Sequence, residues 1–225
     1  MHSSSSRPHA TPESTQAVAF QYTQTDSFAA LLRQLGASLR VFLVLSVVLG
    51  IGYPLVMTGL AQLLFPHQAD GSLVESADRV VGSSLIGQSV SDPAYFRPRP
   101  SAAGAGYDPL ASSASNLGPE NQQLVALVEE RRAEVAELED VDPSTVPPDA
   151  LLASGSGLDP HISPAYAGVQ VARVARERGL PVPQVRALVR EHTDGRSLGF
   201  LGEPRVNVLL LNLALDDLAR AQGGD

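Results

Sequence analysis

Residues 41–65 read VFLVLSVVLGIGYPLVMTGLAQLLF, a run of 25 residues without a charged side chain. A helix rises about 1.5 Å per residue, so this run exceeds the roughly 30 Å hydrocarbon core of a bilayer. A buried helix of a soluble protein seldom continues so far without a charge. A cleaved signal peptide has a shorter apolar part that lies nearer the N-terminus. We therefore predict one uncleaved transmembrane helix.

Three residues inside this run are candidates for contact with a partner helix: Gly52, Pro54 and Gly59. Pro54 removes a backbone hydrogen bond and should kink the helix, and in lipid the freed carbonyl needs a partner. Gly52 and Gly59 fall on roughly one face, where another helix can approach closely. The alternative is that Gly and Pro are simply common in membrane helices.

The arginines around the apolar run predict its orientation. Arg33 and Arg40 lie within about ten residues before it, whereas the first Arg after it is Arg79. Under the positive-inside rule the N-terminus is cytoplasmic and the C-terminal part is outside. This predicts a single-pass inner-membrane protein, in contact with membrane lipid.

The domain organisation follows from this orientation. Residues 1–25, rich in Ser, Thr, Gln and Pro, are expected to form a disordered cytoplasmic tail. Residues 26–65 are expected to form a helix that contains the span. Residues 66–225 are long enough for one extracytoplasmic domain with its own core.

Composition and charge exclude several classes of protein. Of 225 residues, 44% are apolar and 18% charged, as in folded proteins. Residues 66–225 contain 13 Arg against 22 acidic residues, a net charge of −9, which argues against binding to nucleic acid. With no cysteine, disulfides, thiolate metal sites and a cysteine nucleophile are excluded.

The C-terminal part is predicted to be α+β, a mixed α/β domain. Short strands are expected at 79–81 and 84–86, and a strand at 206–210 is expected to continue as a short helix. Helices are expected from Pro119, over 164–178 and over 183–192. The loops over 92–119 and 142–164 are unusually long, which is typical of functional segments or of segments that a partner orders.

The sequence Asp159-Pro160-His161 is the most site-like cluster. One alternative is a membrane-anchored extracytoplasmic hydrolase that uses Ser156, Asp159 and His161. However, the G-x-S-x-G spacing of a nucleophile elbow is absent around Ser154 and Ser156. We favour a local role, in which Asp159 caps a turn and His161 bonds the following loop.

Other polar groupings give weaker signals. The backbone of Ser154, Gly155, Ser156 and Gly157 could cradle a phosphate, which makes these residues weak candidates for nucleotide contact; the chain has no Lys to complete a P-loop. The acidic residues over 129–140 are interleaved with Arg131 and Arg132, as on a solvated helix face. We predict no catalytic residue, no metal ligand and no firmly bound cofactor.

Six stretches, in order, are similar to the C subunit of the Kdp potassium-transporting ATPase, a bacterial P-type system. They are YPLVMTGLAQLLFPHQADGSL (53–73), VGSSLIGQ (81–88), YFRPRPSAAGAGYD (95–108), SSASNLGPENQQL (112–124), ASGSGLDPHISPA (153–165) and GRSLGFLGEPRVNVLLLNLALD (195–216). The resemblance covers nearly everything from Tyr53 to Asp216. Ala114 stands where the family usually has Gly, and Glu120 where Thr is usual.

The resemblance implies a non-catalytic accessory subunit of an ATP-driven, high-affinity potassium uptake complex. Its partners would be a channel-like potassium-binding subunit, a P-type ATPase subunit and a small single-helix subunit; ATP and K⁺ belong to that complex. The family's C subunit stabilises assembly and acts as a catalytic chaperone that raises the ATP affinity of the ATPase subunit. Polar residues in the matching stretches are the candidates for the partner interface: Ser101, Tyr107, Asp108, Asn116, Asn121, Asp159, His161, Glu203, Arg205 and Asn207.

The expected orientation restricts this role. An extracytoplasmic domain does not meet cytoplasmic ATP, so an effect on ATP affinity would pass through the membrane subunits as a coupling free energy. We expect the acidic domain to lie over the entrance of the potassium-binding subunit, where it could raise the local K⁺ concentration modestly.

Overall fold

The computed structural model describes residues 24–77 and 79–223. The tail predicted over 1–25 lies almost wholly outside these residues. The chain divides into one unit that ends at Leu60 and another that begins at Ala61.

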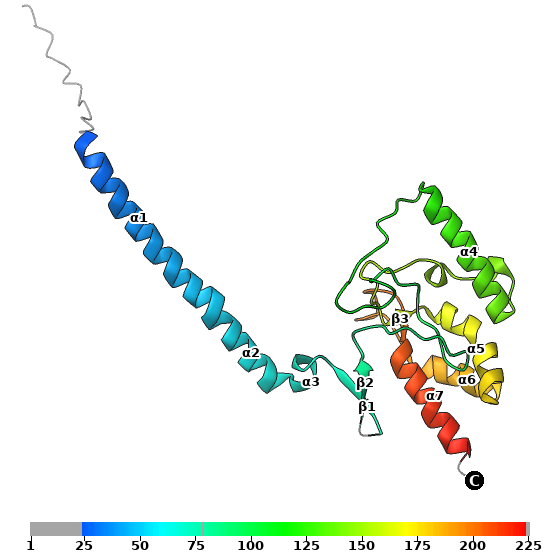
Figure 1. Ribbon diagram of the computed structural model, residues 1–225. Coiled ribbons are helices and arrows are strands. Elements are labelled where there is room, and N and C mark those ends of the chain that lie inside the picture. The colour runs from blue at the N-terminus through cyan, green and yellow to red at the C-terminus, as the bar shows by residue number, and fades with distance from the viewer. Residues whose placement is uncertain (1–23, 78, 224–225) are drawn as a thin grey trace, which may run out of the picture. The chain divides into compact units, whose positions relative to one another are not determined.

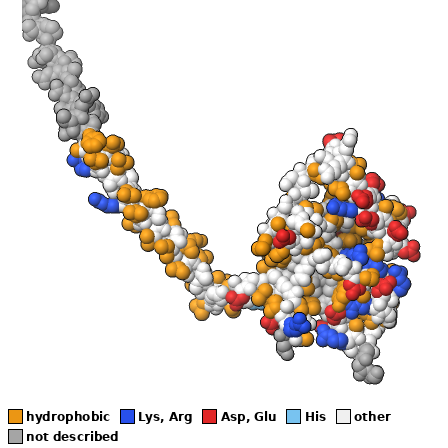
Figure 2. Space-filling model, in the orientation of Figure 1, with side chains coloured by type: hydrophobic (Ala, Val, Ile, Leu, Met, Phe, Trp, Pro, Cys, Tyr) orange, Lys and Arg blue, Asp and Glu red, His pale blue; other side chains and the backbone are white. Residues whose placement is uncertain are grey.

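The first unit is helical. Helix α1 (Gln24–Val47) runs through a π-helical turn, η1 (Val48–Gly52), into α2 (Tyr53–Leu64) (Figure 1). Within the described residues, the stretch Phe28–Leu64 is the one helix long and apolar enough to cross a membrane, and the structure buries none of its most apolar window. Hydrophobic side chains cover it (Figure 2), as expected of a helix whose surroundings are lipid or other helices.

The π-helical turn lies directly before Pro54. The Tyr53 N–H bonds to the carbonyl of Val48, five residues back. Pro54 itself has no N–H, so the regular α-helical ladder is interrupted at this point. The structure thus shows a local change of helix type next to Pro54, while the predicted kink stays a prediction.

The second unit mixes short strands with helices, so the predicted mixture of helix and strand is confirmed. Strands β1 (Leu73–Ser76) and β2 (Arg79–Ser83) pair antiparallel, and β3 (His161–Ile162), β5 (Arg205–Asn207) and β4 (Thr193–Asp194) form a second antiparallel sheet with β5 in its centre. The helical segments are α3 (Pro66–Ala69), α4 (Gln122–Glu139), η2 (Pro143–Thr145), η3 (Pro148–Ala150), α5 (Pro164–Arg178), α6 (Val182–Glu191) and α7 (Val208–Gly223).

Helix ends marked by Pro and Gly were predicted closely. Helix α5 has the predicted bounds, with Ser163 as its N-cap and Gly179 in the left-handed region at φ 65°. Helix α6 begins and ends one residue before its predicted bounds. Helix α4 begins three residues after Pro119, because the Asn121 side chain caps it.

Two strand predictions were wrong. Residues 84–86 form a turn in which the Ser84 N–H bonds to the carbonyl of Ser72, and the partner of β2 is β1, which was not predicted. The strand expected over 206–210 ends at Asn207. Leu211 and Leu215 are both fully buried at helical spacing, so packing makes this segment a 16-residue helix.

The core lies among α5, α6, α7 and the second sheet. Helices α5 and α6 contribute Val171, Val174, Val185 and Val189, α7 contributes Leu211 and Leu215, and the strands contribute Ile162 and Val206. Helix α4 adds Ala136, with Val128 and Val135 packed beside it.

Phe96 enters this core from an arm, residues 92–100, that turns at 93–95 and pairs with no strand in the described chain. Side chains bond its backbone instead. The Asn212 amide accepts from the Phe96 N–H at 2.8 Å and donates to the Phe96 carbonyl at 2.9 Å. Gln170 does the same at Arg97, at 2.7 and 3.1 Å. Helices α5 and α7 thus hold two consecutive residues of the arm.

A buried ion pair holds α4 to α5 and the arm. Arg173 Nε lies 3.0 Å from both carboxylate oxygens of Glu139, and both side chains are 1% exposed. Arg173 also donates to the carbonyls of Pro93 and Tyr95 and to Gln170. Burial raises the pKa of Glu139, and the Arg173 charge opposes that shift. Placing Glu139 on a solvated face was therefore wrong.

We expect the Arg173→Met variant to lose about 3–5 kcal/mol of unfolding free energy, because it leaves Glu139 charged and buried without a partner. Urea unfolding of the full chain in detergent, followed by circular dichroism, measures this. Arg176→Met is the matched control: Arg176 is exposed and lies in an exposed ion pair with its neighbour Glu177, so its loss should stay within about 0.5 kcal/mol. Adding Glu139→Leu to Arg173→Met should recover part of the loss; equal losses for the two single variants would contradict the assignment.

Candidate functional site

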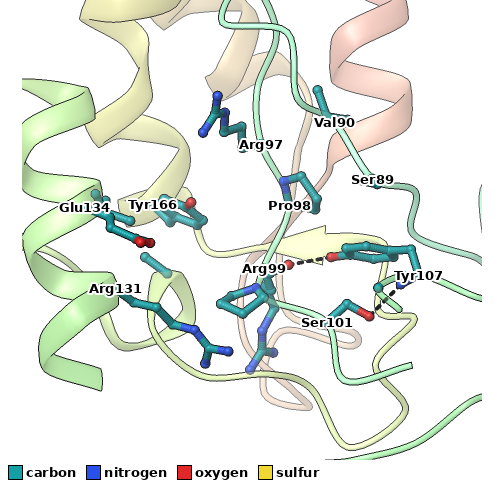
Figure 3. Close-up of a pocket in the computed structure, with 14 residues that line it drawn as sticks. Ser89, Val90, Arg97, Pro98, Arg99, Ser101, Tyr107, Arg131, Glu134 and Tyr166 are labelled. Carbon is teal, nitrogen blue, oxygen red and sulfur yellow. Dashed lines mark hydrogen bonds between the residues drawn. The ribbon is translucent and has the colours of Figure 1, made fainter. Parts of the chain in front are cut away.

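A cavity of about 330 Å³ lies between the arm, α4 and α5. Figure 3 shows the side chains around it. Three arginines line it, Arg97, Arg99 and Arg131, against one carboxylate, Glu134. In a strongly acidic domain this cavity is a local concentration of positive charge, though part of each guanidinium already has a partner within the chain.

Arg99 and Arg131 bond neighbouring carbonyls. Arg131 donates to the carbonyl of Leu151 at 2.8 Å, and Arg99 donates to that of Leu152 at 3.3 and 3.4 Å. Their side chains extend in the same direction (Figure 3). Arg131 is half-buried, so its predicted place on a solvated face is also wrong. The two arginines connect α4 and the arm to the segment that follows η3.

Tyr107 joins the arm to the loop that follows it. Its hydroxyl donates to the Arg99 carbonyl at 2.6 Å, and its N–H donates to Ser101 Oγ at 2.8 Å (Figure 3). Burial raises the pKa of Tyr107, and the charge of Asp159 raises it further. Tyr107 therefore stays a neutral hydrogen-bond donor in this position.

The ASGSG stretch, residues 153–157, is held by the two segments it touches. Ser101 Oγ donates to the Gly157 carbonyl at 2.6 Å, while the Ser113 N–H and the Ser112 hydroxyl donate to the Ser156 carbonyl at 3.0 and 2.9 Å. Gly157 has φ 68°, and a Cβ there would lie 2.6 Å from the Ala103 nitrogen. Only glycine fits this position.

These contacts engage carbonyl oxygens of the stretch, whereas a phosphate needs N–H donors. Ser154, Gly155 and Ser156 line an open hollow of about 570 Å³ with Arg99 and Asp159. Nucleotide contact by Ser154, Gly155, Ser156 and Gly157 stays a prediction.

Asp159 organises the turn that leads into β3. Its Oδ1 accepts from the His161 N–H at 2.9 Å and lies 3.2 Å from His161 Nδ1, and its Oδ2 lies 3.3 Å from Arg99 Nη1. Burial raises the pKa of Asp159, but the hydrogen bonds from His161 and the charges of His161 and Arg99 outweigh it and lower the pKa. This geometry matches the local, turn-capping role.

A hydrolytic triad would also need Ser156 to reach His161. Ser156 Oγ accepts from the Leu158 N–H at 3.1 Å, and among the hydrogen bonds of the described residues none joins Ser156 to His161. The Asp–His half of the constellation is present, and the nucleophile–base half is not formed in this structure.

The other interface candidates do not form one site. Asp108 and Asn116 bond within their own turns, Asp108 to the Leu110 N–H and Asn116 to the Ala114 carbonyl. Asn121 caps α4. The structure therefore brings together Ser101, Tyr107, Asp159 and His161, whereas the side chains of Asp108, Asn116 and Asn121 bond within their own segments.

Glu203 and Arg205, both candidates for the partner interface, each form an ion pair within the second unit. Glu203 lies 2.8 Å from Arg196, and Arg205 lies 3.9 Å from Asp194. Asn207 joins β5 to the turn that follows β2, because its side-chain amide donates to the Ser84 carbonyl at 2.7 Å.

Several residues around the cavity were not predicted, namely Arg97, Glu134 and Tyr166. Arg97 Nε is buried without a hydrogen-bond partner, and burial raises the pKa of Tyr166 to about 12. The alternation of Arg and Pro in FRPRP, residues 96–100, was the available signal, since an extended segment places Arg97 and Arg99 on the same side.

Comparison with known proteins identifies the family. The model of a family described as "KdpC: K+-transporting ATPase, c chain" matches residues 35–217. The chain belongs to the KdpC family. It is 57% identical over 189 residues to a potassium-transporting ATPase KdpC subunit of Kineococcus radiotolerans, covering 84% of this chain and 96% of the relative. A KdpC subunit of Rhodospirillum rubrum is 54% identical over 187 residues, covering 83% and 97%.

The KdpC match extends over the apolar helix from residue 35, the arm, the cavity and α7 as far as residue 217. It therefore covers both units of the fold. The sequence resemblance from Tyr53 to Asp216 is confirmed by this match.

We expect Gly157→Ala to destabilise the second unit by about 1–3 kcal/mol, because alanine is strained at φ 68° and its Cβ meets backbone atoms of Ala103 and Ser113. Gly155→Ala is the control, since open space surrounds a Cβ there. Thermal unfolding of the two full-length variants makes the comparison. A smaller loss for Gly157→Ala than for Gly155→Ala would show that these contacts do not hold the loop.

Proposed function

We propose that this chain is a non-catalytic, membrane-anchored accessory subunit of an ATP-driven potassium uptake complex. The observation that carries the proposal is the KdpC-family match over residues 35–217, together with relatives more than 50% identical that are named subunits of a potassium-transporting ATPase. The partners are a channel-like potassium-binding subunit, a P-type ATPase subunit and a small single-helix subunit. The chain stabilises their assembly.

The exposed apolar helix supports the membrane anchor. The described part of the chain does not cover its large side chains, so lipid and partner helices must cover them. We place Gly52, Pro54 and Gly59 at a helix–helix contact. Among the described residues, no atom lies within 4 Å of a Cβ placed at Gly59, which leaves room for a neighbouring backbone.

We place the second unit outside the membrane, from the positions of Arg33 and Arg40. In that orientation the chain acts as a catalytic chaperone indirectly: it raises the ATP affinity of the ATPase subunit by favouring one conformation of the membrane subunits. The net charge of −9 over residues 66–225 suits a position over the potassium entrance, where it attracts cations over about a Debye length.

The alternative function is a self-sufficient extracytoplasmic hydrolase that uses Ser156, Asp159 and His161. The Asp159–His161 contact at 3.2 Å favours it. It requires turnover by the purified chain alone, and loss of that turnover in His161→Ala.

We expect the chain to co-purify in detergent with an affinity-tagged P-type ATPase subunit encoded beside it, and the purified chain alone to show no hydrolase turnover. The measurement is the stoichiometry of the eluted complex, with the untagged strain as control. Absence of the chain from the eluate, together with turnover that His161→Ala abolishes, would establish the hydrolase instead.

A separate experiment tests the orientation of the chain in the membrane. Because the sequence contains no cysteine, a single introduced cysteine is the one thiol in the chain that a maleimide can label. Single cysteines replace Ser14 and the exposed Ser115, and intact spheroplasts receive a membrane-impermeant maleimide. We expect labelling at position 115 and not at 14, with both labelled after lysis. The reverse pattern would place the second unit in the cytoplasm and allow direct nucleotide contact at residues 154–157.

A further inference from the structure

Between β4 and β5 the second unit presents three large apolar side chains to solvent. They lie in the loop Ser197–Gly202, which we call the apolar loop: Leu198 is 82% exposed, Phe200 70% and Leu201 50%. Exposing neighbouring large apolar groups to water costs hydrophobic free energy. An exposed apolar surface of this kind usually forms an interface with another molecule.

The apolar loop has a fixed backbone. Ser197 and Leu201 exchange two backbone hydrogen bonds, both of 2.9 Å, and the Gly199 and Phe200 N–H groups donate to the Arg196 and Ser197 carbonyls at 3.1 and 3.3 Å. Leu198 is held at φ 54°, a left-handed conformation that costs free energy for a residue with a side chain. A loop fixed in this way loses little conformational entropy when it binds.

The charges at the base of the apolar loop are paired. Arg196 lies 2.8 Å from Glu203, and Arg205 lies 3.9 Å from Asp194. The base is therefore neutral overall, while residues 66–225 as a whole carry −9. An anionic lipid surface would repel such a unit rather than attract it, so a protein surface is the better occupant.

We propose that the apolar loop is a docking anchor, which inserts Leu198, Phe200 and Leu201 into an apolar socket of a polytopic subunit of the potassium-transporting ATPase. The inference rests on the proposed function and deepens it by naming the surface that makes the contact. A few apolar and aromatic side chains in a dry pocket, surrounded by polar residues, supply most of the free energy of such interfaces. The paired charges at the base form that polar surround.

The first test places the photoreactive residue p-benzoylphenylalanine at Phe200, a conservative change in shape, in the full complex in native membranes. Irradiation should give an adduct that contains peptides of a polytopic partner subunit. Leu110 is the control position, because it is 96% exposed and apolar but lies in another loop. An adduct with a second copy of this chain or with lipid, no adduct at all, or equal yields at the two positions would overturn the proposal.

The second test measures affinity for the partner. Phe200→Ser and Leu198→Asn, the latter chosen because Asn tolerates a left-handed φ, should each weaken retention on the tagged partner about tenfold or more. Leu110→Ser should leave retention unchanged, and unchanged melting temperatures show that the variants fold. If wild type co-purifies and all variants are retained equally, the apolar loop is not the anchor; if wild type itself does not co-purify, the proposed function fails first.

Discussion

The fold of the second unit depends on side chains that replace a strand. The arm that carries Phe96 into the core pairs with no strand in the described chain, and a backbone without a neighbouring strand leaves polar groups to satisfy. Asn212 and Gln170 each give one donor and one acceptor to a residue of the arm, and Arg173 and Arg178 bond further carbonyls, those of Tyr95 and Ala94. Without these contacts the arm, and the cavity beside it, would have no fixed position.

The sequence predicted those elements whose ends are marked by local chemistry. Pro164 and Gly179 mark the two ends of α5, so the bounds of this helix could be predicted from the sequence. Strands of two or three residues, such as β3 and β5, carry no measurable alternation. The side-chain hydrogen bonds to the arm, and the cavity beside it, could not be predicted from the sequence. Gln170 and Asn212 bond residues that lie 73 and 116 positions away in the chain.

The long loops were expected to be functional or to be ordered by a partner, and the structure shows hydrogen bonds that join them to one another. Ser101 and Ser113 bond the ASGSG stretch, and Gly87 closes against Asp159 and Tyr107, where a Cβ would lie 2.6 and 2.7 Å from their atoms. The large apolar side chains that stay exposed in the described residues lie elsewhere, and include those of the apolar helix and of the apolar loop. Membership in the KdpC family gives both features the same explanation, a chain that completes its packing within a larger assembly.

Every Lys-or-Arg position of this chain is an arginine, because the sequence contains no lysine. A guanidinium keeps its proton up to pH values at which an ammonium group has lost it. The same absence leaves the two units without any side-chain amine, so reagents that join lysine to lysine would map the neighbouring subunits around this chain and leave its own folded surface unmodified.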